Sequence, residues 1–115
     1  MTTTIWHKPR CSKSRQTLAL LEAEGVDVTI KLYLEDTPSP ATLSKVLGQL
    51  GIPAWDWLRR GEAAFKTLGL SKDSGDQAIL EAMHAHPVLI ERPVVIHGKR
   101  AALGRPPENV LALFD

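Results

Sequence analysis

The chain has 115 residues, of which 43% are hydrophobic and 23% charged, as in one ordinary globular domain. Fourteen Lys and Arg against thirteen Asp and Glu give a net charge of +1, which lacks the basic excess of nucleic-acid-binding proteins. No apolar run approaches the roughly 20 residues of a membrane-spanning helix. We therefore expect a single domain over residues 1–115, with neither a nucleic-acid nor a membrane partner.

The first third of the chain has the pattern of a strand, a helix and a second strand. Thr3–Trp6 is rich in β-branched and aromatic residues, which favour a strand. A helix is predicted over residues 12–24, ending before Gly25. Apolar and polar residues then alternate over residues 26–34, which predicts a long strand. Such a unit places its two strands parallel in one sheet.

The middle of the chain is helical and its end returns to sheet. Helices are predicted over residues 39–50, 53–59, 62–68 and 76–85. Strands over residues 93–97 and 100–103 flank Gly98-Lys99, which suits a type II′ hairpin turn, and a terminal helix follows Pro107. The predicted fold class is α/β, a mixed sheet with a helical insert, at about residues 39–86, between the second and third strands.

A single cysteine, Cys11, limits the chemistry of the chain. No intramolecular disulfide and no multi-thiolate zinc site can form. The first residues, Met1–Ile5, carry no secretion-signal pattern, so a reducing, cytoplasmic location is expected.

Cys11 lies where the first strand meets its helix. A helix N-terminus carries partial positive charge and free N–H groups, which favour the thiolate. Four basic residues crowd the same loop and act in the same direction: Lys8, Arg10, Lys13 and Arg15. An ordinary buried cysteine is the alternative, but this setting favours an activated nucleophile.

Two spacings narrow the kind of cysteine chemistry. Ser14 stands three residues after Cys11, so the loop has no second thiol to resolve a disulfide. Thr17 stands six residues after Cys11, where a phosphatase loop needs arginine. An oxidised Cys11 must therefore pass its oxidation state to an external thiol.

Three arginines beside helix ends, turns or prolines are candidates for binding an oxyanion: Arg59, Arg92 and Arg105. The guanidinium fork donates two parallel hydrogen bonds to tetrahedral anions. A solvated surface charge is the alternative for each, and Arg60 is an equal candidate to Arg59. His84 and His86 are two residues apart on a helix and cannot converge on a metal, so no metal site is expected.

Residues 7–15, His-Lys-Pro-Arg-Cys-Ser-Lys-Ser-Arg, resemble the glutaredoxin-dependent arsenate reductase (ArsC) family, in a short subgroup with the motif Pro-Arg-Cys-Ser-Lys-Ser-Arg. Residues 91–95, Glu-Arg-Pro-Val-Val, and 104–111, Gly-Arg-Pro-Pro-Glu-Asn-Val-Leu, extend the resemblance. It implies a thioredoxin-like fold and a nucleophilic Cys11. The resemblance also implies that the oxyanion is bound by Arg59, Arg92 and Arg105. Supporting positions are His7, Ser14, Arg15 and Pro93, with Arg92-Pro93 at the point where such folds carry a cis proline.

The same resemblance implies reduction of arsenate to arsenite, with glutathione as co-substrate, glutaredoxin as electron donor and no bound cofactor. Two alternatives stay open: a thiol–disulfide oxidoreductase of another substrate, and a non-catalytic thioredoxin-like regulator that binds RNA polymerase. Those regulators carry Cys-x-x-Cys. Ser14 in place of the second cysteine, together with the three arginines, favours the enzyme.

Overall fold

The computed structural model describes all residues, Met1–Asp115. Its elements are, in chain order, β1 (Thr3–Trp6), α1 (Ser12–Ala23), β2 (Val28–Lys31), α2 (Pro40–Leu50), α3 (Ala54–Trp57), α4 (Ala63–Leu68), η1 (Lys72–Ser74), α5 (Asp76–Ala85), η2 (Pro87–Leu89), β3 (Val94–His97), β4 (Arg100–Leu103) and η3 (Pro107–Phe114). The chain divides into two compact units, residues 1–36 with 92–115, and residues 37–91. The expectation of one domain over the whole chain stays a prediction.

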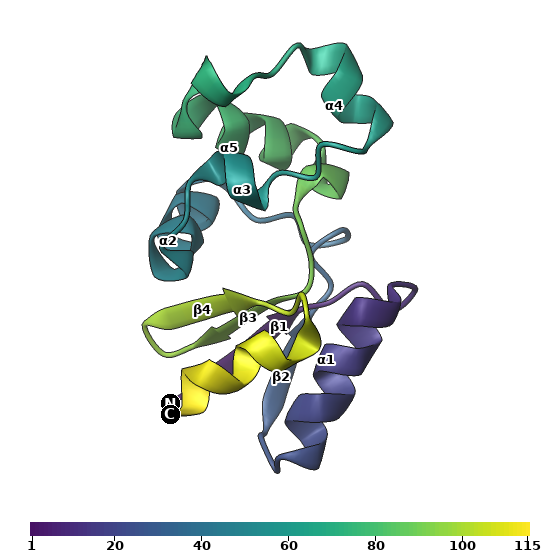
Figure 1. The fold of residues 1–115 in the computed structure, drawn as a ribbon, viewed down its shortest axis with the longest axis vertical. Coiled ribbons are helices and arrows are strands. Elements are labelled where there is room, and N and C mark those ends of the chain that lie inside the picture. Colours follow the sequence, from purple (N-terminus) through teal and green to yellow (C-terminus); the bar gives the residue numbers. More distant parts are fainter. The chain divides into compact units, whose positions relative to one another are not determined.

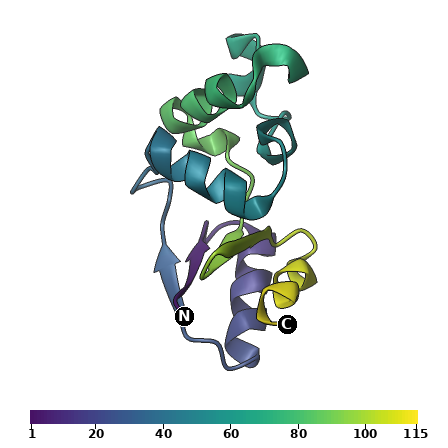
Figure 2. The same ribbon diagram turned by 90° about the vertical axis from the view of Figure 1, so that its left-hand side faces the viewer.

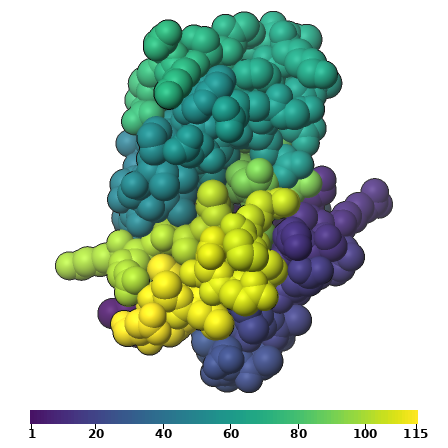
Figure 3. All heavy atoms as spheres, viewed as in Figure 1, coloured from purple at the N-terminus to yellow at the C-terminus, as the bar shows by residue number.

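The first unit is built on a four-stranded sheet in the order β2-β1-β3-β4. β1 pairs in parallel with β2 and antiparallel with β3, and β3 pairs antiparallel with β4. α1 and η3 lie side by side on the same face of this sheet (Figures 1 and 2). In Figure 3 the C-terminal segment, in yellow, lies against the yellow-green atoms of the β3–β4 hairpin.

The core of the first unit lies between the sheet and these two helices. Ile5 of β1 and Val95 of β3 are register partners, and both side chains are fully buried. They pack with Leu21 of α1 and with Val110 and Leu113 of η3. Burying each such side chain contributes about 1.5–3 kcal/mol, so this cluster fixes α1 against the sheet. It thereby fixes the start of α1, where Cys11 lies.

The predicted strand over residues 26–34 is wrong in its length, and its alternation matches burial only at its start, where Val26 and Val28 pack against the core. Only Val28–Lys31 forms β2, at one edge of the sheet, and a turn follows, closed by hydrogen bonds to the Leu32 carbonyl. Ile30 is 49% exposed, whereas Tyr33, expected on the polar face, is fully buried. β2 is an edge strand, so the burial of its side chains depends on which helices and loops pack beside it. The alternation of apolar and polar residues does not by itself show this.

The second unit is helical, as the predicted insert requires. Ser39 Oγ accepts the Thr42 N–H at 3.1 Å at the start of α2, and Gly51 ends the helix in the left-handed conformation at φ 69°. α2 contacts α5, and α5 also contacts α3. Their shared interior holds fully or almost fully buried side chains: Leu43, Val46, Trp57, Ile79, Leu80 and Met83.

Two predicted helices differ from the structure. The helix expected over residues 53–59 ends at Trp57, because Leu58 forms a bridge with Ile90 and the Arg59 N–H donates to the Leu89 carbonyl at 2.8 Å. The terminal helix is of the 3₁₀ type throughout.

The predicted hairpin between residues 93–97 and 100–103 is present in the structure. In its two-residue turn Gly98 has a φ of 60° and Lys99 has a negative φ, which fits a type II′ turn. No helix has the length and apolarity needed to cross a bilayer.

Candidate active site

Cys11 is the N-cap residue of α1, with extended backbone angles of φ −89° and ψ 122°. Its N–H donates to the Lys8 carbonyl at 2.9 Å, and its carbonyl accepts the Arg15 N–H at 3.0 Å. These bonds close the loop on one side and start the helix on the other. The thiol is partly exposed, so the helix N-terminus presents it where a small substrate can reach it.

The environment of the thiol favours its ionised form. Burial raises the pKa of Cys11, but hydrogen bonds outweigh this effect and the net pKa is lowered. The donors are the Ser14 N–H, the Arg92 side chain, whose charge adds to the effect, and the Lys13 N–H. Arg105 adds a further donor, with Nη2 at 3.6 Å from Cys11 Sγ. A thiolate held by backbone donors and guanidinium groups is the nucleophilic form of cysteine.

Arg92 and Arg105 are fixed to each other as well as directed at the sulfur. Arg105 Nε donates to the Arg92 carbonyl at 2.7 Å, and Arg92 is only 9% exposed. The Arg92–Pro93 peptide bond is cis, which confirms the expectation for Pro93. The Arg105–Pro106 bond is also cis, which the sequence did not indicate. Two predicted oxyanion ligands and the predicted nucleophile therefore lie together.

Gly104, which precedes Arg105, permits the close approach of three segments. A Cβ at this position would lie 2.7 Å from Pro93 Cγ and 3.1 Å from Thr17 Cγ2, and closer still to Thr17 Oγ1. The Gly104 N–H donates to the Pro93 carbonyl at 2.9 Å. Only glycine fits between α1 and the Arg92–Pro93 bend, so this residue sets the position from which Arg105 starts.

His7 and Ser14 form a buried pair beneath the loop. Ser14 Oγ accepts the Lys8 N–H at 3.1 Å and lies 2.6 Å from His7 Nδ1. Burial and the charge of Arg15 both lower the pKa of His7, so the ring is neutral near pH 7. This pair fixes the first turn of α1, whose N–H groups face the thiol.

The basic residues of the loop carry uncompensated charge. Arg15 Nη1 donates to the Pro9 carbonyl at 2.9 Å, a neutral acceptor. None of the loop cations, Lys8, Arg10, Lys13 and Arg15, forms an ion pair. The region around Cys11 is therefore positively charged, which suits an anionic substrate.

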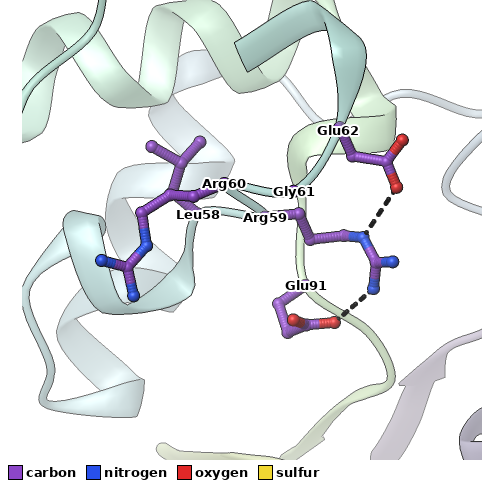
Figure 4. A pocket seen from close by; sticks show the side chains of 6 residues that line it. All are labelled: Leu58, Arg59, Arg60, Gly61, Glu62 and Glu91. Atoms are coloured by element: carbon purple, nitrogen blue, oxygen red, sulfur yellow. Dashed lines mark hydrogen bonds and ion pairs between the residues drawn. The ribbon is translucent and has the colours of Figure 1, made fainter. Parts of the chain in front are cut away.

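Arg59 belongs to the second unit and has different partners. It lines a cavity of about 540 Å³ with Leu58, Arg60, Gly61, Glu62 and Glu91 (Figure 4). Its Nη1 donates to Glu91 Oε1 at 2.6 Å and its Nε donates to Glu62 Oε1 at 3.2 Å. Burial lowers the pKa of Arg59, but the two carboxylates raise it more strongly. The two carboxylates thus hold the guanidinium in place.

Arg60, an equal candidate from the sequence, points away from Arg59 in Figure 4. Its guanidinium lies 4.7 Å from the ring centroid of Trp55, and Trp55 in turn contacts the ring of Phe65 edge-on. The structure therefore separates two neighbouring arginines into one that lies in an ion-pair cluster and one that stacks on an aromatic ring.

The structure brings together Cys11, Arg92 and Arg105, with His7 and Ser14 below them; the catalytic roles of these residues stay predictions, as does that of Arg59. Sequence reasoning missed Gly104, Glu62 and Glu91. Glu62 could have been found from its spacing of three residues from Arg59. Glu91 lies 32 residues away, so no local pattern indicates it. No cluster of three or more His, Cys, Asp or Glu side chains could hold a metal ion.

Comparisons with known proteins show the family to which the chain belongs. Residues 6–113 match the sequence model of the ArsC family. A protein of Haemophilus influenzae named arsenate reductase is 42% identical over 99% of this chain and 100% of its own length. An Escherichia coli relative, named Uncharacterized protein YfgD, is 44% identical over 95% of this chain and 93% of its own length.

A solved structure shares the fold almost completely. The arsenate reductase from Vibrio cholerae superposes with a TM-score of 0.94 at 43% identity, covering 98% of each chain. This likeness and the strand order confirm the predicted fold class, a thioredoxin-like mixed sheet with a helical insert between the second and third strands.

Proposed function

Since the chain belongs to the ArsC family, we propose that it is an arsenate reductase in which the Cys11 thiolate is the nucleophile. The observation that carries the proposal is the set of donors around the sulfur. The Ser14 and Lys13 N–H groups and Arg92 lower the pKa of Cys11, and Arg105 Nη2 lies 3.6 Å from Sγ. The same guanidinium groups suit an arsenate oxyanion placed for attack.

In the first step the thiolate attacks As(V). A sulfur–arsenic bond forms, one arsenic–oxygen bond breaks, and the leaving oxygen takes up protons and departs as water. Arsenic is not yet reduced at this point. Positive charge around the sulfur stabilises both the incoming anion and the charge that builds up on its oxygens.

In the second step arsenic is reduced. A glutathione thiolate attacks Cys11 sulfur, a sulfur–sulfur bond forms, and the sulfur–arsenic bond breaks with its electron pair staying on arsenic, which leaves as arsenite. A glutaredoxin thiolate then takes the glutathionyl group and releases Cys11 as thiolate. The single cysteine supports this route, because the chain cannot form an internal disulfide. The route also requires a reducing compartment, for which we propose the cytoplasm.

A groove beside the loop suits glutathione. It encloses about 260 Å³ and is lined by Lys8 and Arg10, by Pro9, Leu32 and Leu34, and by His7 and Glu35. Glutathione carries two carboxylates and one ammonium, which complement the two cations and the one carboxylate of this lining. We expect Arg10→Glu to raise the KM for glutathione several-fold while the KM for arsenate changes less.

The test is an arsenite assay on the purified protein with arsenate, glutathione and glutaredoxin. We expect arsenite to form repeatedly with the complete mixture and Cys11→Ser to form none. Without glutaredoxin, intact mass spectrometry should find one glutathione on Cys11. Ser14→Cys supplies a second thiol in the loop and should lower the dependence on glutaredoxin if the two sulfurs can bond.

Two results would point to the alternatives. Disulfide reduction without any arsenite formation would indicate a thiol–disulfide oxidoreductase of another substrate. Stable binding of RNA polymerase by a protein inactive in both assays would indicate a regulator.

A further inference from the structure

The cavity around Arg59 has an unusual balance of charge for a site that receives an anion. Two carboxylates contact one guanidinium, through Glu91 Oε1 at 2.6 Å and Glu62 Oε1 at 3.2 Å. Arg60 also lines the cavity, but its side chain points away from both carboxylates (Figure 4). Its guanidinium lies over the ring of Trp55. Two carboxylates thus share one guanidinium at Arg59.

These carboxylates also occupy hydrogen-bond donors that an oxyanion needs. A guanidinium has five N–H groups, and Arg59 has its Nε–H and one Nη1–H engaged. An arriving oxyanion meets repulsion from both carboxylates and finds the Nε edge of the fork partly taken. Three N–H groups of Arg59 remain available to an oxyanion, but the charge of the guanidinium is shared with the two carboxylates.

Glu91 is held in this position by the framework of its own unit. Its N–H donates to the Trp57 carbonyl at 3.1 Å, and Trp57 Nε1 donates back to the Glu91 carbonyl at 3.2 Å. Trp57 is fully buried, so this double contact fixes the backbone of Glu91 beside Arg59. The side chain is 24% exposed, against 34% for Glu62. Of the two carboxylates, Glu91 thus has the shorter and better-shielded ion pair.

We propose that Glu91 is an internal counter-anion of Arg59, with which a tetrahedral oxyanion competes for the guanidinium, so that this residue sets the affinity for the substrate. The inference rests on the proposed function, since it takes Arg59 as an oxyanion ligand. Glu91 is not a catalytic residue in this account. Its carboxylate neutralises part of the charge of Arg59 while no substrate is bound, and competes with the substrate afterwards. Glu62 acts in the same direction and more weakly.

The test is Glu91→Gln, which keeps the size of the side chain and an oxygen that accepts from Arg59 Nη1 but removes the charge. We expect the KM for arsenate to fall by about tenfold, with kcat within about twofold of the native value. A residue that merely positions Arg59 would leave KM unchanged in this variant, because the amide still accepts the bond. Glu81→Gln is the matched control, since Glu81 is exposed on α5 and contacts only Gln77 among side chains.

Binding without turnover separates this inference from the proposed function. Calorimetric titration with inorganic phosphate and with arsenate measures oxyanion affinity in the native protein and in Glu91→Gln, whether or not arsenite forms. Tighter binding of either anion by the variant supports the inference even if the native protein reduces no arsenate. Equal or weaker binding, an unchanged or raised KM, or no binding to either protein overturns it.

A second variant tests the same inference if Glu91→Gln does not fold. Glu62→Gln removes the more exposed carboxylate, which has no long-range backbone contact to lose, and should lower the KM for arsenate by about twofold to threefold. A KM that stays the same or rises in this variant counts against charge competition at Arg59.

Discussion

Cys11 and Arg59 are both partly buried functional groups, and their surroundings have opposite character. N–H groups and guanidinium groups surround the thiol, and they lower its pKa despite burial. Two carboxylates surround the guanidinium of Arg59 and raise its pKa despite burial. In each unit the chain thus stabilises the charge of its own side chain.

The difference lies in what a substrate meets. At Cys11 the stabilising groups are hydrogen-bond donors and guanidinium groups, which also suit an oxyanion. At Arg59 the stabilising groups are acceptors of the same charge as the substrate. The groups around Cys11 attract an anion, whereas the carboxylates around Arg59 compete with it. Variants that remove donors in the first unit and charges in the second unit test this distinction from both sides.

The largest effect is expected from the two arginines beside the sulfur. Arg92→Ala and Arg105→Ala each remove a donor near Cys11, and we expect kcat/KM for arsenate reduction to fall by about 100-fold to 1,000-fold. Lysine at either position should restore only part of the activity, because it lacks the planar fork. Steady-state kinetics of arsenite formation measure both effects.

Arg100→Ala is the control for these variants. Arg100 lies in the same unit on β4 and donates to the Ala112 carbonyl at 2.9 Å. Its loss should leave kcat/KM within about twofold, since surface contacts of this kind contribute little. Similar losses in all three alanine variants would mean that net charge, and not the placement of Arg92 and Arg105, drives the reaction.

A pair of glycine substitutions compares the packing of the two units. Gly104→Ala places a Cβ against Pro93 and Thr17 and should lower the free energy of unfolding by about 1–3 kcal/mol. Gly48→Ala in α2 meets no atom within 4 Å and should raise it by about 0.5–1 kcal/mol, the helix propensity difference. Urea denaturation monitored by tryptophan fluorescence measures both.

The two variants should change the free energy of unfolding in opposite directions. If Gly104→Ala is neutral, the junction between α1 and the Arg92–Pro93 bend is loose, and Arg105 is not held as the structure describes. A destabilised variant that keeps its kcat/KM at low temperature would show that this junction supports folding without setting the geometry of the site.

The pH dependence of Cys11 tests the donor environment directly. The rate of alkylation by iodoacetamide follows the thiolate fraction, so its midpoint should lie below the value of about 8.5 for a free cysteine. Because the folded-state pKa is lowered, ionised Cys11 stabilises the fold above the unfolded-state pKa, and this contribution is lost as pH falls through the folded-state pKa. Arg92→Ala should move the alkylation midpoint upward, whereas Arg100→Ala should leave it in place.

Sequence patterns predicted elements well where local chemistry decides them. The Ser39 cap, the left-handed Gly51 and α5 over residues 76–85 follow from contacts within a few residues. The alternation over residues 26–34 misled, because the burial of Tyr33 and the exposure of Ile30 depend on what covers an edge strand.

In the candidate site, too, local sequence patterns indicate some residues and not others. Cys11 at a helix N-terminus could be inferred from a strand, a loop and a helix in sequence. The partners of Arg59 could not, since Glu91 is 32 residues away and reaches Arg59 through the fold of the second unit. Nor could the sequence separate Arg59 from Arg60, because two adjacent residues of one type differ only in where the backbone directs them.

The smallest expected effect is that of Arg60→Ala, which tests the difference between Arg60 and Arg59. Arg60→Ala removes a cation from the ring of Trp55 and leaves the Arg59 ion pairs with Glu62 and Glu91 intact. The stacking contributes about 0.5–1 kcal/mol at an exposed position, so the variant should lose about that much stability. Its kcat/KM for arsenate should stay within about threefold of the native value, whereas Arg59→Ala should lose about 100-fold. Because the two substitutions remove the same charge from adjacent positions, long-range electrostatics alone would give equal losses. Equal kinetic losses would therefore contradict a specific role for Arg59, and with it the view that the two carboxylates regulate a ligand of the substrate.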